Sequence, residues 1–214
     1  MNKAVDDGQD PERIKRPWEE QYRDDDVETM PWFCPDLDHD VAAALDDLNI
    51  APATALDIGA GPGTQSIALA KLGFQVTGTD ISPSAVNKAQ LRAEKENVVI
   101  SFVHDDVLQT QLNATFALII DRGCFHVIEP EQQADYLKSV THLLDDGGYL
   151  FLKTFHKQED CEQGPPNRFE AADISQIFAA DFDLIESRDS AFKGNADFSP
   201  KALFCVLRKS GSGA

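Results

Sequence analysis

The sequence lacks a C-x-x-C pair, and no apolar stretch approaches the roughly 18 residues of a membrane span. Its cysteines are scattered, which fits neither a disulfide framework nor a zinc ribbon and favours a reducing compartment. The first 20 residues are charged and do not contain the apolar core of a signal peptide. We therefore expect a cytoplasmic protein without a membrane partner. The cysteines are Cys34, Cys124, Cys161 and Cys205.

Basic residues are also scarce. Lys and Arg number 19 against 37 Asp and Glu, so the formal net charge is -18. An acidic surface repels phosphate backbones and anionic lipid, so nucleic acid is not an expected partner. Solubility or a salty habitat explains the acidic excess more simply than a role in function does. We expect a monomer or weak homodimer.

The length and composition favour one compact domain with a separate N-terminal segment. The chain has 214 residues, of which 42% are apolar, and a single core accommodates that length. The N-terminal residues are mostly polar, yet they include both tryptophans, Trp18 and Trp32, and so much aromatic area must be buried against something. We predict a cover over residues 1–35, a main domain over 36–209, and a linker or tag remnant over 210–214.

Short apolar runs alternate with amphipathic stretches after residue 53, which is typical of βαβ units and predicts a parallel sheet covered on both faces. The predicted fold class is therefore α/β. A helix capped by Asp38 or Asp40 precedes the first strand, and the last two strands are expected to form an antiparallel pair. Strands are predicted over residues 54–58, 75–79, 98–103, 116–120, 149–154, 182–188 and 202–208, and helices over 64–72, 83–94, 130–144 and 171–179.

A glycine-rich turn lies where the first predicted strand meets the first helix of the sheet. Gly59, Gly61 and Gly63 alternate, which permits a tight turn and leaves room for a ligand. Thr64 stands where a dinucleotide-binding motif needs its third glycine, so a nucleotide-dependent oxidoreductase is disfavoured. Asp80 ends the second strand and is placed to accept both hydroxyls of a ribose. The alternative for Asp80 is a cap on the following helix.

These motifs resemble those of the class I S-adenosylmethionine-dependent methyltransferases over nearly the whole chain. The resemblance implies S-adenosylmethionine as cofactor and a Rossmann-like fold, with a seven-stranded, mostly parallel sheet in the order 3-2-1-4-5-7-6. It implies that the glycine turn contacts the cofactor and that Asp57 helps to hold its methionine end. Asp80, with Ile81 beside it, matches the ribose site, and Asp106 with Val107 matches the turn that contacts adenine.

Residues 121–126 follow the fourth strand and read DRGCFH. They lack the Asn/Asp-Pro-Pro-aromatic tetrad of enzymes that methylate amino groups of nucleobases or glutamine. They resemble instead the thiopurine, thiol and halide methyltransferase branch, where Arg122 matches a residue that touches the cofactor. Trp18 and Trp32 match tryptophans of that branch and are counted among the cofactor contacts, and residues 164–166 match its Gly-Pro-Pro. The implied acceptor is a small soft nucleophile: a thiol, thiopurine, sulfide or halide.

Methyl transfer makes few demands on side chains, because positioning and exclusion of water supply most of the rate. No metal is needed. A thiol ionises near ~8.5 and requires only modest activation, which an imidazole could supply. His126 is therefore the predicted base, Asp121 its predicted catalytic neighbour, and His156 the second candidate base. The alternative for either histidine is a role in capping or packing.

Two other functions stay open. Cys124, with Cys34 and Cys161 on neighbouring loops, could bind arsenite or tellurite for methylation, although a packed cysteine is the simpler interpretation. The protein could also bind S-adenosylmethionine without transferring its methyl group. Aromatic side chains are expected to form an apolar wall that keeps water from the site, unless they belong to the core. These aromatic residues are Trp32, Phe33, Phe125 and Phe155.

Overall fold

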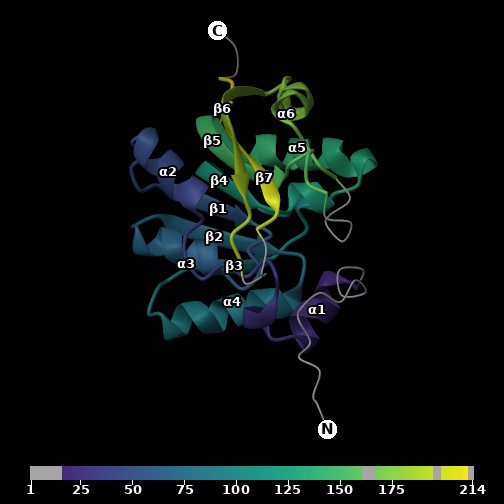
Figure 1. Ribbon diagram of the computed structural model, residues 1–214. Coiled ribbons are helices and arrows are strands. Elements are labelled where there is room, and N and C mark those ends of the chain that lie inside the picture. Colours follow the sequence, from purple (N-terminus) through teal and green to yellow (C-terminus); the bar gives the residue numbers. More distant parts are fainter. Residues whose placement is uncertain (1–15, 161–166, 195–198, 212–214) are drawn as a thin grey trace.

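The computed structural model describes residues 16–160, 167–194 and 199–211, and these residues contain a seven-stranded mixed sheet (Figure 1). The strand order is β3-β2-β1-β4-β5-β7-β6, and β7 runs antiparallel to both of its neighbours. The predicted Rossmann-like α/β fold and its strand order are therefore confirmed. The strands are β1 Thr54–Ile58, β2 Gln75–Asp80, β3 Ser101–His104, β4 Phe116–Arg122, β5 Leu144–Phe155, β6 Phe182–Ala191 and β7 Lys201–Lys209.

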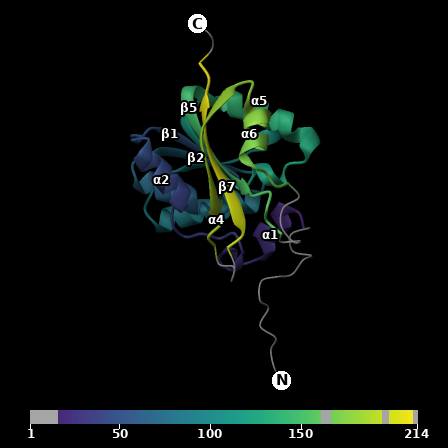
Figure 2. The same ribbon diagram turned by 45° about the horizontal axis from the view of Figure 1, so that its top comes forward.

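Helices cover both faces of this sheet. One face, which includes Ala55 and Phe151, packs against α2, α3 and α4, while the other, which includes Leu56 and Leu152, packs against α5 and α6. Adjacent residues of one strand reach opposite faces because side chains alternate along a strand. Figure 2 shows α5 and α6 on the side away from α2. The helices are α1 Trp18–Asp24, α2 His39–Asp47, α3 Thr64–Lys71, α4 Pro83–Lys95, α5 Gln133–Leu143 and α6 Ala171–Phe178.

Local sequence signals determine where the helices begin. Asp38 is the cap of α2, and its side chain accepts a hydrogen bond from the amide of Asp40. Ser82 is the cap of α4, where its hydroxyl accepts from the amide of Ala85 and proline takes the first helical position. Asp80 is therefore not the cap of this helix, and the alternative interpretation of that residue is wrong.

Three elements start three or more residues away from their predicted positions. The third strand begins at Ser101 rather than residue 98, because Asn97 has a positive φ of 56° and the amide of Val98 donates to the carbonyl of Ala93 to close α4. The helix expected from residue 130 starts with a 3-10 turn, Pro130–Gln132, before α5. The fifth strand, β5, starts five residues earlier than predicted.

Residues 16–35, the described part of the predicted cover, lie against α4. Tyr22 of α1 packs in a small apolar cluster with Ala85 of α4. The carboxylate of Glu19 accepts hydrogen bonds from the hydroxyl of Ser82 at 2.7 Å and from the amide and hydroxyl of Ser84 at 3.0 and 2.7 Å. The described part of the cover is thus attached by polar contacts at the start of α4 as well as by apolar packing.

Some predicted features fall outside the described residues: residues 1–15 of the cover, Cys161, the Gly-Pro-Pro segment at 164–166, and residues 212–214. Ser210, at the start of the predicted linker, donates its amide to the carbonyl of Asp181 at 2.9 Å. No helix within the described ranges is long and apolar enough to cross a membrane.

A buried ion-pair cluster joins α2 to the ends of two strands. The Asp38 carboxylate contacts Lys153 Nζ of β5 at 2.8 Å and Arg122 Nε of β4 at 2.8 Å. Burial alone would raise the pKa of Asp38, but the charges of Lys153 and Arg122 outweigh burial and lower it. Lys153 Nζ also contacts Asp40 at 2.7 Å. These charges compensate one another away from water, so removal of one member leaves the others uncompensated.

The substitution Asp38→Asn should lower the free energy of unfolding by about 3 kcal/mol or more, because it leaves Arg122 and Lys153 without their shared carboxylate. Urea denaturation measures this change. Asp36→Asn is the matched control, since Asp36 is exposed and two residues away, and its effect should stay within about 0.5 kcal/mol. Equal effects of the two substitutions would show that the cluster contributes little.

Candidate active site

The glycine turn after β1 has the backbone geometry that glycine alone accepts easily. Gly59 and Gly61 have positive φ values of 64° and 52°. A Cβ on Gly59 would lie 3.1 Å from the Cβ of Cys124, and a Cβ on Gly61 would lie 2.6 Å from the hydroxyl oxygen of Tyr22. The turn is therefore bounded by the segment after β4 on one side and by the cover on the other.

Gly63 has a different role from the one its position in the motif suggests. Its φ is 77°, and a Cβ there would lie 2.8 Å from the ring of Phe102 and 2.9 Å from Ala89. Its missing side chain thus permits close packing of α3 against α4 and β3. The structure gives no reason to place Gly63 against a ligand.

Asp80 lies next to the glycine turn. Its two carboxylate oxygens accept hydrogen bonds from the amides of Gly61 at 2.9 Å and Ser82 at 2.8 Å. Each oxygen retains a lone pair, so the carboxylate can still accept from a ligand. Burial raises the pKa of Asp80 to about 6, although both amides act in the opposite direction. The neighbouring Ile81 is 51% exposed, which leaves an apolar surface beside the carboxylate.

The predicted adenine turn lies at the same edge of the sheet. The amide of Asp105 donates to the carbonyl of Asp80 at 3.1 Å, which ties the end of β3 to the end of β2. Asp106 caps a 3-10 turn that begins at Val107, and its carboxylate accepts from the amide of Leu108 at 2.9 Å. The structure therefore brings the glycine turn, Asp80 and Asp106 together along adjacent strand ends, as the sequence predicts.

Asp57 is used inside the protein. Its carboxylate accepts the hydroxyl hydrogen of Ser66 at 2.6 Å, which fixes the start of α3 to β1. The side chain is buried, and burial raises its pKa to about 7. Asp57 thus supports the glycine turn, and a direct contact with a ligand stays a prediction.

Asp121 organises the turn after β4. Its carboxylate accepts amide hydrogens from Gly123, Cys124 and Phe125 at 3.1, 2.7 and 3.0 Å, and a hydroxyl hydrogen from Tyr136 at 2.7 Å. Burial raises its pKa to about 6. These four donors use its accepting capacity, so the geometry assigns Asp121 to positioning the turn rather than to proton transfer.

His126 lies at the expected strand end, but its geometry does not suit a base. Its Nδ1 accepts the amide hydrogen of Phe155 at 3.1 Å, which places the ring proton on Nε2. Burial, with the charge of Arg122, lowers its pKa to about 3. A ring whose accepting nitrogen is occupied and whose pKa is this low takes up a proton poorly near neutral pH. The structure therefore argues against the predicted role of His126.

His156 is engaged in a similar way. Its Nδ1 accepts the amide hydrogen of Gln158 at 3.0 Å, and its Nε2 lies 3.3 Å from a carboxylate oxygen of Asp189. This arrangement matches the capping alternative.

Arg122 joins the cover to the sheet. Its three nitrogens donate to the Asp38 carboxylate at 2.8 Å, the carbonyl of Trp32 at 3.2 Å and the carbonyl of Lys193 at 2.7 Å. The family resemblance does not predict these three hydrogen-bond acceptors of Arg122. A contact between Arg122 and a cofactor stays a prediction.

The two tryptophans lie together in the cover. The rings of Trp18 and Trp32 pack edge to face with centroids 5.5 Å apart, and Trp32 Nε1 donates to the hydroxyl of Tyr22 at 3.2 Å. Sequence reasoning missed Tyr22 as a site residue. Its position in the sequence could have indicated this, because Tyr22 comes four residues after Trp18 and such residues lie on the same face of a helix.

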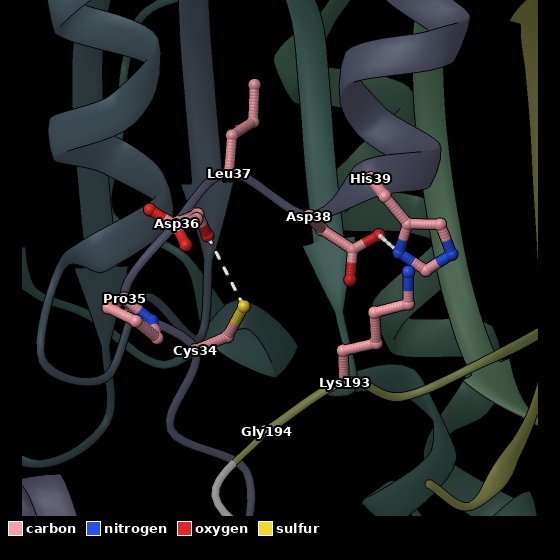
Figure 3. A pocket seen from close by; sticks show the side chains of 8 residues that line it. All are labelled: Cys34, Pro35, Asp36, Leu37, Asp38, His39, Lys193 and Gly194. Atoms are coloured by element: carbon pink, nitrogen blue, oxygen red, sulfur yellow. Dashed lines mark hydrogen bonds and ion pairs between the residues drawn. The ribbon is translucent and has the colours of Figure 1, made fainter.

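Cys124 faces the glycine turn, where burial and the nearby carboxylates hold its pKa well above the usual value. Its thiol therefore stays protonated. Cys34 donates its thiol hydrogen to the carbonyl of Asp36 at 3.3 Å, on the wall of a separate pocket of about 310 Å³. Figure 3 shows Cys34 and Asp36 on one side of this pocket and His39 with Lys193 on the other.

Asp38, His39 and Asp40 have potential metal-binding atoms within 4.8 Å of one another. Lys153 Nζ contacts both carboxylates, at 2.8 and 2.7 Å, so an ammonium group already supplies the positive charge there. This cluster holds α2 on the sheet.

The expected aromatic wall is divided between the core and the surface. Phe125 is fully buried within the main core, and Phe33 is buried in the cover cluster. Trp32 and Phe155 are half-buried at the edge of the sheet. The first two are therefore core residues, whereas the last two can still face a ligand.

Comparison with known proteins gives a consistent result. The methyltransferase domain family matches residues 55–148. An uncharacterized methyltransferase of Schizosaccharomyces pombe is 33% identical over 101 residues, which cover 47% of this chain and 70% of that protein. The mitochondrial ubiquinone biosynthesis O-methyltransferase of the same organism is 35% identical over 106 residues, which cover 48% of this chain and 38% of that protein.

A solved structure from work on the conversion of a disulfide bond into a thioacetal group during echinomycin biosynthesis has the same fold. Its TM-score is 0.79 at 20% identity, and the match covers 92% of each chain.

The contact between Gly61 and Tyr22 can be tested with Gly61→Ala. Gly147→Ala is the matched control, since Gly147 also has a positive φ of 77° but its nearest neighbour is an arginine side chain 3.6 Å away. Both substitutions should cost about 1–2 kcal/mol of backbone strain. Only Gly61→Ala should displace Tyr22 and so change tryptophan fluorescence and speed hydrogen exchange over residues 18–33. Identical fluorescence and exchange in the two variants would contradict this contact.

Proposed function

Because the chain belongs to the class I S-adenosylmethionine-dependent methyltransferases, we propose that it methylates a small soft nucleophile, with thiols as the first choice. The observation that carries the proposal is that both predicted proton-transfer groups are occupied. His126 Nδ1 accepts an amide hydrogen, and Asp121 accepts four hydrogen bonds. A thiol can react as the thiolate that forms in solution or in the site, so it needs no strong base.

The geometry fits the cofactor. The glycine turn lies between Cys124 and Tyr22 at the strand ends, where only glycine fits, and the neighbouring Asp80 has lone pairs left for ribose hydroxyls. Ile81 offers an apolar surface for the adenine, and the turn at Asp106 closes that end of the site. When bound, S-adenosylmethionine supplies a methyl group that its positive sulfonium already activates.

The protein's own residues have two tasks in this proposal. Asp121 holds the amides of residues 123–125 in one turn, which fixes Cys124 against Gly59 and so shapes the site. The cover residues Trp18 and Trp32 exclude water from the reacting groups. Arg122 holds the cover in place through the carbonyl of Trp32. The acceptor sulfur forms its bond to the methyl carbon as the carbon–sulfonium bond breaks, and the thiol proton goes to solvent.

Sulfur chemistry in a structural relative agrees with this choice. The structure that covers 92% of this chain comes from work on the conversion of a disulfide bond into a thioacetal group. The similarity to a ubiquinone biosynthesis O-methyltransferase points instead to an oxygen acceptor. An oxygen acceptor that must lose a proton would require an accepting group, and His126 and Asp121 do not offer one.

Cofactor binding should depend on the ionisation of Asp80, whose pKa is about 6. Lowering the pH through about 6 protonates the carboxylate and removes an acceptor, so calorimetry should show weaker binding of S-adenosylhomocysteine at low pH. Asp80→Asn should weaken binding about 10-fold or more at pH 8 and lose the part of the pH dependence that Asp80 supplies. Glu96→Gln, on the surface of the same chain, is the control. Identical binding curves for Asp80→Asn and the control would contradict the assignment.

With S-adenosylmethionine saturating, so that protonation of Asp80 does not limit cofactor binding, the acceptor proposal predicts that the thiol sets the pH dependence of transfer. For a thiol that ionises near neutral pH and an alkyl thiol that ionises at higher pH, kcat/KM should rise with pH, and each midpoint should follow the pKa of the thiol. Release of S-adenosylhomocysteine and product mass measure the reaction. His126→Ala should lower kcat by less than about 10²-fold, the lower end of general-base contributions. A midpoint that is the same for both thiols and vanishes in His126→Ala would restore His126 as the base.

A further inference from the structure

Phe192 reaches from one edge of the fold to the turn after β4. It follows β6, and the strand order places β7 and β5 between β6 and β4. A Cβ on Gly123 would nevertheless lie 3.7 Å from Cε1 of Phe192. The Phe192 ring centroid lies 5.6 Å from that of His126 and 5.3 Å from that of Phe155. Phe192 therefore covers the strand ends at which Asp121 positions its turn.

The ring is held from several directions. The Arg122 guanidinium carbon and Lys153 Nζ each lie 5.4 Å from its centroid, within the range of cation–π contacts. The amide of Phe192 donates to the carbonyl of Pro200 at 2.8 Å, and Arg122 Nη2 donates to the carbonyl of Lys193 at 2.7 Å. The loop that carries Phe192 is therefore fixed to the sheet at two backbone positions.

The same loop also approaches the cover. A Cβ on Gly194 would lie 2.4 Å from the carbonyl oxygen of Pro31, so only glycine permits this approach without a shift of the backbone. The loop after β6, the cover and the turn after β4 thus meet around Phe192.

The exposure of Phe192 differs from that of the core phenylalanines. Phe125 is fully buried and belongs to the main core, whereas Phe192 is half-buried and lies outside the buried clusters. A half-buried aromatic ring at this edge can gain further contact when an apolar molecule binds beside it. Its partners His126 and Phe155 add apolar surface from the ends of β4 and β5.

We propose that Phe192 is a specificity-determining residue, and that its ring forms the outer wall of the methyl-acceptor site and limits the size of the apolar group on the acceptor. The proposal rests on the proposed function, because it assigns the wall of the same site. If Phe192 only shielded Arg122 and Lys153 from water, its replacement would affect stability without changing which acceptors fit.

Acceptor selectivity provides the first test. The ratio of kcat/KM for 2-naphthalenethiol to that for ethanethiol should rise about 10-fold or more in Phe192→Ala, since the smaller side chain admits the larger group. Phe192→Leu keeps an apolar side chain beside Arg122 and serves as the second variant if Phe192→Ala folds poorly. Its ratio should lie between those of the original protein and Phe192→Ala. Lys193→Ala changes the adjacent exposed residue of the same loop and should leave the ratio unchanged. A ratio within about twofold of the original in both Phe192 variants overturns the proposal.

A binding measurement separates this proposal from the proposed function. We would replace Phe192 with 4-fluorophenylalanine in the full chain and record its fluorine resonance with S-adenosylhomocysteine present. Addition of thiophenol should shift the resonance in a saturable way, whether or not methyl transfer is detected. A shift without any methyl transfer would support the wall and count against thiol methylation. Methyl transfer to thiophenol without a shift would support the proposed function and overturn the role of Phe192. If there is neither a shift nor transfer, both proposals fail.

Discussion

The arrangement of the strand ends depends on the buried carboxylate of Asp38. It compensates the charges of Lys153 on β5 and Arg122 on β4, at distances of 2.8 Å, while its position as the cap of α2 fixes that helix to the sheet. Arg122 then donates to the carbonyls of Trp32 in the cover and Lys193 after β6. Since such a cluster is strong only when it is complete and shielded from water, these segments are positioned together rather than one by one.

A second group of carboxylates at the same edge is stabilised by hydrogen bonds. Asp57, Asp80 and Asp121 accept from backbone amides and hydroxyls, and burial raises their pKa values to about 7, 6 and 6. A cofactor that brings a positive sulfonium complements this concentration of negative charge.

The sequence predicts the fold and the cofactor side of the site more fully than the acceptor side. The glycine turn and Asp80 follow from local patterns, whereas the strand order and Asp106 follow from the family resemblance that these patterns support. The pairing of Asp38 with Lys153 joins residues 115 positions apart, and no local pattern specifies it. No local pattern indicates the position of Phe192 either. The sequence predicts His126 at a strand end, but only the orientation of its ring shows that Nδ1 accepts the amide hydrogen of Phe155.

That orientation bears directly on how the site can work. A histidine next to a reacting group is often a base, but here the backbone of β5 occupies its accepting nitrogen, and its pKa of about 3 keeps it neutral. Asp121 is likewise committed to holding a turn. His126 and Asp121 thus both fix backbone at this edge of the sheet. Catalysis by positioning alone is sufficient when the acceptor is intrinsically reactive, which is the physical basis for proposing a sulfur nucleophile.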